Sequence, residues 1–281
     1  MAPPTISEAA VQGFHDGALY DAHRPSYPPE AVDALLRGLG VAGRQGAKIV
    51  EIAAGTGKFT VPLAARAEKF EIRAVEPLGS MRDQLAAKGI ENVEVLEGSA
   101  TAVPVEDGWG DACIVAQAFH WFANVEALAE LRRVIKPNTS LAVIWNIEDY
   151  NKPASWKAAT PWEQKLNELI FSLKLDGQPR FREERWKDVF LDKTGDNGRV
   201  HELFVTPISE DIFRWTVWLT DEALLLRLRT LSQVAILQGE DKEKFDKTFY
   251  DIVRGPEVER NEEGLLPLHG GTVVAWTRRV D

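Results

Sequence analysis

The sequence contains one cysteine, Cys113, among 281 residues. A single cysteine cannot form an internal disulfide, so a fold held together by disulfides is excluded. Cys113 lies within the apolar run 112–116, which is typical of a small core residue rather than a nucleophile. A reducing compartment fits this usage.

Long apolar runs are also missing. No stretch approaches the roughly 20 residues that a membrane-spanning helix needs. The opening residues, Met1-Ala2-Pro3-Pro4, have no basic segment followed by an apolar one. We therefore expect a cytoplasmic protein without a membrane partner.

Basic residues are the scarcer charge, with 33 Lys and Arg against 43 Asp and Glu and a formal net charge of −10. This charge repels a phosphate backbone unless a local basic run overcomes it, and the sequence has no such run. We expect no nucleic acid partner. The sequence also has no internal repeats and no low-complexity tracts. Its length predicts one large domain, in which a cap is added to a single core.

Strand-like and helix-like segments alternate through the first half of the chain. We expect strands over 48–53, 72–76, 93–96, 111–116 and 141–145, and helices over 30–39, 59–66, 80–88 and 125–135. This alternation indicates an α/β fold with a parallel sheet. After Asn146 we expect helices over 163–173, 209–218, 221–237 and 242–253, a short strand over 200–206, and a last strand over 271–279.

The first expected strand runs into a glycine turn, Glu51-Ile52-Ala53-Ala54-Gly55-Thr56-Gly57. Such turns bind nucleotide-like ligands, because glycine allows a sharp turn and a close approach of ligand to backbone. A P-loop is excluded because Ile52 and Phe59 stand where it needs a glycine and a Ser or Thr. A dinucleotide turn is weakened because Thr60 replaces its third glycine, and the acidic Glu76 serves any adenosine ligand.

Further motifs along the chain indicate which protein family this turn resembles. Glu51-x-Ala53-x-Gly55-x-Gly57 resembles the first motif of class I S-adenosylmethionine-dependent methyltransferases, with Ala53 in place of the first glycine. The resemblance continues, in order, through Val75-Glu76-Pro77 with Met81, Glu97-Gly98-Ser99-Ala100, the run 115–122 and the run 132–138. It covers about residues 14–147, and this ordered set of motifs resembles the small-molecule branch that includes trans-aconitate-methyltransferase-like proteins.

The resemblance implies a Rossmann-like sheet of seven strands, mostly parallel with a final antiparallel strand, and a helical substrate cap. It divides the chain into an N-terminal lid (1–30), a cofactor-binding core (31–147), a cap (148–270) that contains one core strand (200–206), and a final core strand (271–281). The implied cofactor is S-adenosylmethionine, with S-adenosylhomocysteine as its product.

Roles follow from the resemblance residue by residue. Gly55, Gly57 and Ala53 would lie under the methionine and ribose, Glu51 near the ammonium group, and Glu76 at the ribose hydroxyls. The remaining cofactor contacts would come from Pro77 and Met81 at the adenine, Ser99 and Ala100 at its edge, Gln117, Ala118 and Phe119 past the sulfonium, and Tyr20 and Arg24 at the methionine carboxylate.

Methyl transfer from a sulfonium is an in-line displacement with a neutral leaving group, so alignment and exclusion of water contribute most. A carboxylate acceptor needs no base, whereas an alcohol does. His120 is the one histidine beside the expected reaction centre. It would act either as a general base or as a brace for the Phe119-His120-Trp121-Phe122 loop, and we favour the brace. We expect no metal.

The acceptor pocket is expected above the sheet. Its predicted lining residues are Trp121, Trp145, Asn146, Trp215, Trp218 and Arg227. We predict methyl transfer to an oxygen or sulfur of a small molecule, with a thiol methyltransferase of secondary metabolism as the alternative. A cofactor-binding protein without transfer and an NAD-dependent oxidoreductase are alternatives of other classes. Base methylation of nucleic acid is not supported, because Gln117-Ala118-Phe119-His120 differs from the Asn/Asp-Pro-Pro-aromatic motif of those enzymes.

Overall fold

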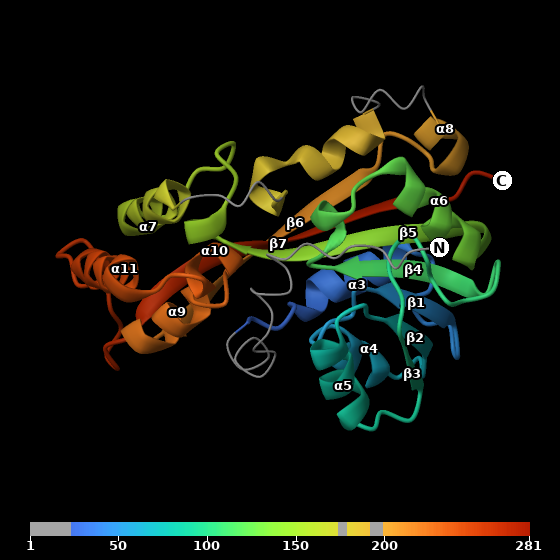
Figure 1. The fold of residues 1–281 in the computed structure, drawn as a ribbon, viewed down its shortest axis with the longest axis horizontal. Coiled ribbons are helices and arrows are strands. Elements are labelled where there is room, and N and C mark those ends of the chain that lie inside the picture. The colour runs from blue at the N-terminus through green and yellow to red at the C-terminus, as the bar shows by residue number, and fades with distance from the viewer. Residues whose placement is uncertain (1–23, 174–178, 192–198) are drawn as a thin grey trace.

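The computed structural model describes residues 24–173, 179–191 and 199–281. At its centre is a seven-stranded sheet in the order β3-β2-β1-β4-β5-β7-β6 (Figure 1). The strands are β1 (Lys48–Ile52), β2 (Glu71–Val75), β3 (Val93–Leu96), β4 (Gly110–Ala116), β5 (Ile135–Glu148), β6 (Ser209–Leu219) and β7 (Leu266–Arg278). β1 to β5 pair in parallel, and β7 is antiparallel to both β5 and β6. The predicted fold class is confirmed.

Helices cover both faces of the sheet. The α-helices are α3 (Pro29–Gly38), α4 (Thr60–Ala64), α5 (Gly79–Ala87), α6 (Val125–Val134), α7 (Pro161–Ser172), α8 (Arg199–Leu203), α9 (Asp221–Leu228), α10 (Ser232–Ala235) and α11 (Gly239–Val253). Short 3-10 segments are η1 (Phe119–Trp121), η2 (Asp149–Asn151), η3 (Phe181–Glu183) and η4 (Arg185–Leu191). No helix of the described ranges is long and apolar enough to cross a membrane.

The sequence builds the two faces by alternation along the strands. Val50 and Ile52 of β1 belong to a core with α6, η3 and η4, whereas Ile49 belongs to the opposite core with α3, α4 and α5. Both cores are closed by β5 and β7, through Val143 on one face and Ile144 on the other. Burial on both faces explains why the central strands are apolar throughout.

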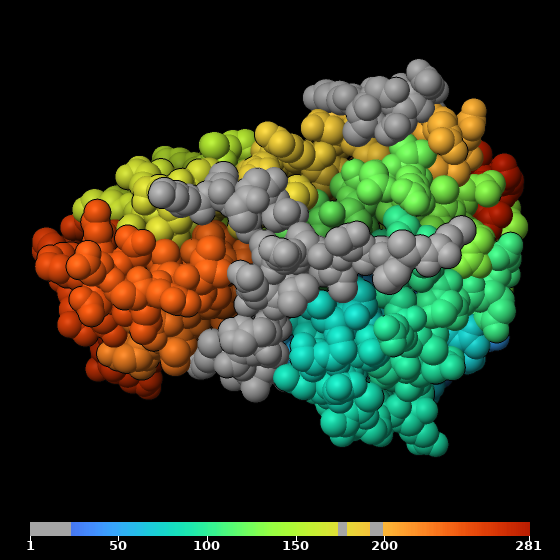
Figure 2. Space-filling view, viewed as in Figure 1, coloured from blue at the N-terminus to red at the C-terminus, as the bar shows by residue number. Residues whose placement is uncertain are grey.

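A third core lies at the far end of the long strands. In Figure 1, β5, β7 and β6 extend toward α7, α9 and α11, and Figure 2 shows α9–α11 as one mass at that end. Tyr150, Trp162 and Leu228 are fully buried there, or nearly so, with Leu266 and Leu268 of β7. The cap is therefore built on the extended half of the sheet.

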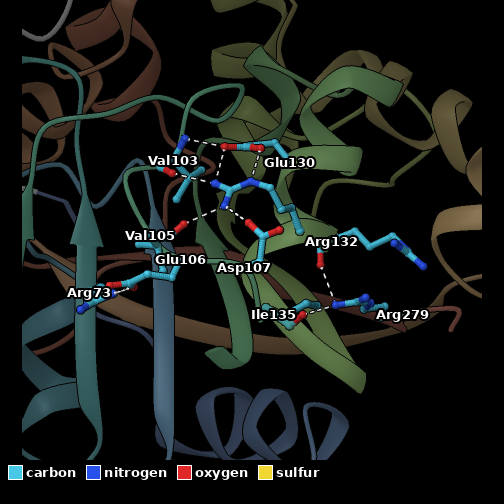
Figure 3. A network of polar contacts seen from close by, with 10 residues as sticks. Arg73, Val103, Val105, Glu106, Asp107, Glu130, Arg132, Ile135 and Arg279 are labelled. Atoms are coloured by element: carbon cyan, nitrogen blue, oxygen red, sulfur yellow. Dashed lines mark hydrogen bonds and ion pairs between the residues drawn. The ribbon is translucent and has the colours of Figure 1, made fainter. Parts of the chain in front are cut away.

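The run 132–138 that the sequence analysis singled out has a structural role. Arg133 donates to the carbonyl oxygens of Val103 and Val105 at 2.8 Å each and pairs with Glu130 and Asp107. Figure 3 labels these four partners. These contacts fasten the segment between β3 and β4 to α6. The motif identifies the fold and not a ligand contact.

Two predicted elements are wrong. The segment 209–218 was expected to be a helix and is strand β6, in which Phe213, Trp215, Val217 and Leu219 are half-buried on one face. The segment 200–206 was expected to be a core strand and is mainly helix α8, followed by a single bridge from Phe204 to Arg279.

Both corrections have a physical reason. Cross-strand pairing with β7 over eleven residues outweighs the weak local preference of 209–219. With β6 in the last sheet position, Val200 of α8 packs on the core of α6 instead of entering the sheet. The expected helix over 221–237 is also divided, into α9 and α10.

Candidate active site

The turn after β1 carries three residues with left-handed backbone. The φ angles are +55° at Ala53, +59° at Gly55 and +87° at Gly57. Gly57 also packs tightly, because a Cβ there would lie 2.4 Å from Cδ1 of Leu85 in α5. Glycine is required at Gly57 for both reasons.

Ala53 holds a conformation that costs an L-residue about 1–2 kcal/mol. We expect Ala53→Gly to raise the free energy of unfolding by up to about 1 kcal/mol, because the greater freedom of glycine in the unfolded chain offsets part of the gain. Urea denaturation measures the change. Ala54→Gly, next to it and without a positive φ, is the control and should lower stability. An equal loss in both variants would show that Ala53 is not strained.

Glu51 is a buried carboxyl group at the end of β1. It has no exposed surface, and neither carboxyl oxygen has a hydrogen-bond partner among the described residues. Burial raises its pKa to about 8, the nearby Thr60 hydroxyl opposes this rise, and the charge of Glu76 adds to it. Such a group fits a cationic ligand that would supply the missing partner.

Glu76 lies at the end of β2 and joins the first two turns. Its carboxylate accepts the backbone N–H groups of Gly55 and Leu78, both at 2.8 Å. Burial raises its pKa, while these two N–H groups and Arg82 act in the opposite direction. A carboxylate has about four acceptor positions. Glu76 therefore retains acceptor capacity for the hydroxyl groups expected from the sequence.

The residues expected around the adenine follow β2 and β3, which are neighbours in the sheet. Met81 of α5 is buried, and its Sδ lies 3.7 Å from the position of a Cβ on Gly55. Ala100 is buried, whereas Pro77 and Ser99 are partly exposed. These positions surround the carboxyl edge of the sheet beside the glycine turn.

The loop after β4 is fastened to β5. Gln117 adopts a φ of +62°, its backbone N–H donates to the Ile144 carbonyl oxygen at 2.8 Å, and its side-chain amide donates to the Asn146 carbonyl oxygen at 3.2 Å. Ala118 is partly exposed. The Phe119 side chain is fully buried against Phe190, so only its backbone can face a ligand.

His120 is held by a neighbour on β5. The indole Nε1 of Trp145 donates to Nδ1 of His120 at 3.1 Å. Burial lowers the pKa of His120 to about 3, and the positive charges of Arg180 and Arg24 lower it further. The ring is therefore neutral at physiological pH.

The six expected pocket residues do not form one wall. Trp215 and Trp218 were both expected to line the pocket, but they are three positions apart on strand β6 and therefore lie on opposite faces of the sheet. Trp145 and Asn146, adjacent on β5, also face opposite sides, and they have 0% and 2% exposure. Trp121 is partly exposed beside His120.

Asn146 instead fastens the N-terminal segment to the sheet. Its side-chain Nδ2 donates to the backbone carbonyl oxygens of Pro25 and Ser26 at 3.3 Å each. Its side-chain Oδ1 accepts from the Thr272 hydroxyl at 2.6 Å. Trp215 donates to the same Thr272 hydroxyl at 3.0 Å. Tyr20 lies outside the described residues.

A buried polar cluster that the sequence analysis missed lies between the end of β5 and the α9–α10 junction. We call it the arginine cluster; it consists of Arg24, Glu148, Tyr150, Arg180, Arg227, Ser232 and Gln233. Arg24 donates to the Thr230 carbonyl oxygen at 3.2 Å, and Arg180 to the Ser232 hydroxyl at 3.3 Å. Arg180 and Arg227 are 7% and 9% exposed.

Within this cluster, burial raises the pKa of Tyr150 well above its usual value, and the neighbouring Glu148 carboxylate adds to that shift. Arg24 and Arg227 act in the opposite direction. Tyr150 is therefore a neutral phenol. Only Arg24 and Arg227 of this cluster were named from the sequence, because burial of the others depends on how distant segments meet.

Comparisons with known proteins agree with this geometry. The family described as "Methyltransferase domain" matches residues 50–143. An uncharacterized methyltransferase of Schizosaccharomyces pombe is 34% identical over 239 residues, which are 85% of this chain and 86% of that protein. An uncharacterized methyltransferase of Mycobacterium bovis is 34% identical over 73% of this chain and 70% of its own length.

The chain belongs to the class I S-adenosylmethionine-dependent methyltransferase family. A solved structure described as a proposed methyltransferase from an antibiotic biosynthesis pathway of Anabaena variabilis shares the fold, with a TM-score of 0.57, 17% identity, and coverage of 90% of this chain and 98% of that one. The methyltransferase assignment made from the motifs is confirmed. The trans-aconitate-like branch stays a prediction.

Proposed function

We propose that this methyltransferase uses S-adenosylmethionine to methylate an oxygen or sulfur of a small molecule. Glu51 carries the cofactor part of this proposal, because a fully buried carboxyl group without a hydrogen-bond partner lies beside the two-glycine turn. The ammonium group of the cofactor would supply that partner. Arg24 would meet the cofactor carboxylate, and Glu76 the ribose hydroxyls.

When bound, the cofactor supplies an electrophilic methyl group on a sulfonium. The protein contributes alignment and exclusion of water, because the end of β5 and Phe119 are buried and the other residues around His120 are partly buried. Neither titratable ring offers a base: His120 accepts from Trp145 through Nδ1, and Tyr150 is a neutral phenol. This favours an acceptor that is already ionised, such as a carboxylate or a thiolate.

The arginine cluster supports an acidic acceptor. Arg180 and Arg227 are buried near the neutral rings of His120 and Tyr150, on which their charges act. A planar guanidinium suits a carboxylate because it donates two parallel hydrogen bonds. We propose that these two arginines orient an anionic acceptor.

We expect Arg227→Gln to raise the KM for an acidic acceptor about tenfold or more, because it removes one charge-assisted contact, with little change in the Kd of S-adenosylhomocysteine. The control is Arg229→Gln on the turn after α9, since Arg229 pairs with Asp246 instead. The acceptor for these measurements is first identified by testing which members of a panel of carboxylic acids and thiols receive a labelled methyl group from the cofactor. An unchanged KM in Arg227→Gln contradicts the acidic acceptor and leaves methyl transfer intact.

Stability of the product to base separates the alternatives. A methyl ester hydrolyses in base, whereas the thioether made by a thiol methyltransferase survives. A protein that binds the cofactor without transfer would release no S-adenosylhomocysteine with any acceptor. Family membership argues against the NAD-dependent alternative. The cytoplasmic location and the absence of nucleic acid and membrane partners stay predictions.

A further inference from the structure

The hydrogen bond between Trp145 and His120 has a fixed direction. An indole N–H can only donate, so Nδ1 of His120 must present its lone pair at 3.1 Å. A neutral imidazole carries one proton, which is then on Nε2. Nε2 has no hydrogen-bond partner within the described part of the chain.

A general base at Nε2 would need the opposite tautomer. Moving the proton to Nδ1 would turn two N–H groups toward each other in a buried site, which removes a hydrogen bond and adds repulsion. Forming the imidazolium is opposed as well, because burial disfavours a charged ring and the positive charges of Arg180 and Arg24 lower its pKa further. The surroundings of His120 therefore favour one neutral tautomer.

Trp145 is itself rigidly held. It is fully buried, and its ring lies 4.6 Å from Trp186 and 4.9 Å from Phe181, centroid to centroid. The indole cannot turn away without disturbing this aromatic cluster. The donor that sets the tautomer is therefore part of the core.

We propose that Trp145 is a positioning residue that fixes His120 as a neutral hydrogen-bond donor, with its Nε2–H directed to the acceptor atom of the methyl transfer. The ring then orients the acceptor and removes no proton. This inference rests on the proposed function for the identity of the group that His120 contacts. The tautomer itself does not depend on that function.

Nitrogen NMR of the protein labelled with 15N-histidine tests the tautomer, since protonated and unprotonated ring nitrogens have well-separated shifts. His120→Gln identifies the signals of His120 among the five histidines. We expect wild type to show the Nε2–H form throughout about pH 5–8, a range far above its lowered pKa. In Trp145→Phe we expect a mixture of tautomers.

Trp186→Phe is the matched control. It removes a buried indole from the same cluster, but its Nε1 has no hydrogen-bond partner among the described residues. We expect its His120 signals to match wild type. An Nδ1–H tautomer or an imidazolium in wild type, or equal spectra in the two tryptophan variants, would overturn the proposal.

Kinetics with an active acceptor separate a donor from a base. His120→Gln keeps a side-chain N–H, so we expect kcat/KM within about tenfold of wild type, against a loss of roughly 10–100-fold in His120→Phe. Equal losses in both would overturn the donor role. A protein that binds no S-adenosylhomocysteine would refute the proposed function, and the NMR result would be unaffected.

Discussion

Glu51→Gln is expected to make the protein more stable and a poorer binder of its cofactor. The pKa of Glu51 rises from 4.5 to about 8 on folding, so the folded state holds a proton that the unfolded state has released at neutral pH. Glu51 therefore lowers stability increasingly as pH rises from about 4.5 to about 8, and the cost near pH 7 is roughly 3 kcal/mol. Glutamine is neutral at every pH and removes this cost.

Urea denaturation at pH 4.5 and pH 7 checks the sign. The two proteins should have similar free energies of unfolding at the lower pH, and Glu51→Gln should exceed wild type at the higher one. Glu71→Gln, an exposed residue of β2, is the control and should change neither value. The same pH dependence in wild type and Glu51→Gln would show that Glu51 does not titrate as described.

The cost to function should appear in the same variant. A carboxylate that pairs with the cofactor ammonium contributes a charge-assisted hydrogen bond of about 1.5–3 kcal/mol. We therefore expect the Kd of S-adenosylhomocysteine to increase roughly 10–100-fold in Glu51→Gln. A stabilised protein with weaker binding is the usual signature of a strained functional group.

Gly57→Ala is expected to have the second large effect. The φ of +87° costs an alanine about 1–2 kcal/mol, and its Cβ would lie 2.4 Å from Cδ1 of Leu85. Displacing Leu85 adds a further cost of about 1–3 kcal/mol. We expect a loss of about 2–5 kcal/mol in the free energy of unfolding and loss of detectable cofactor binding, because the turn and α5 must move apart.

Two variants separate the causes. Gly55→Ala has a positive φ of +59° but only Met81 Sδ near its Cβ, at 3.7 Å, so it should lose only the conformational part. In the double variant Gly57→Ala with Leu85→Ala, the contact is relieved, and the total loss should be smaller than the sum of the single losses. Equal tolerance of alanine at Gly55 and Gly57 would contradict this account.

The fold of the first half could be predicted because each element carries its own signal. Apolar strands such as 111–116 and helical spacings such as that of Ala31 and Leu35 lie next to clear turns, and the structure places these elements within a few residues of the expectation. The glycine turn could be predicted for the same reason, because its signal lies in a few adjacent residues. The family assignment rests on these local signals.

The cap could not be predicted as well because its elements depend on distant partners. The alternation of Phe213, Trp215, Val217 and Leu219 was a strand signal in the sequence, but the apolar Ile212 just before it and Trp218 within it obscured this signal. The arginine cluster joins residues as far apart in the sequence as Arg24 and Gln233, and no local pattern shows that they meet. Side-chain direction at Trp145 and Asn146 follows from β5 extending to Glu148.

Calorimetric titration with S-adenosylhomocysteine tests the central claim most directly. We predict one saturable site with a Kd well below about 1 mM, which is a binding free energy stronger than about −4 kcal/mol. Titrations at pH 7 in buffers of different ionisation enthalpy should also show release of about one proton, because Glu51 must ionise to pair with the ligand ammonium. No saturable binding at about 1 mM ligand would contradict the claim that the turn after β1 holds the cofactor.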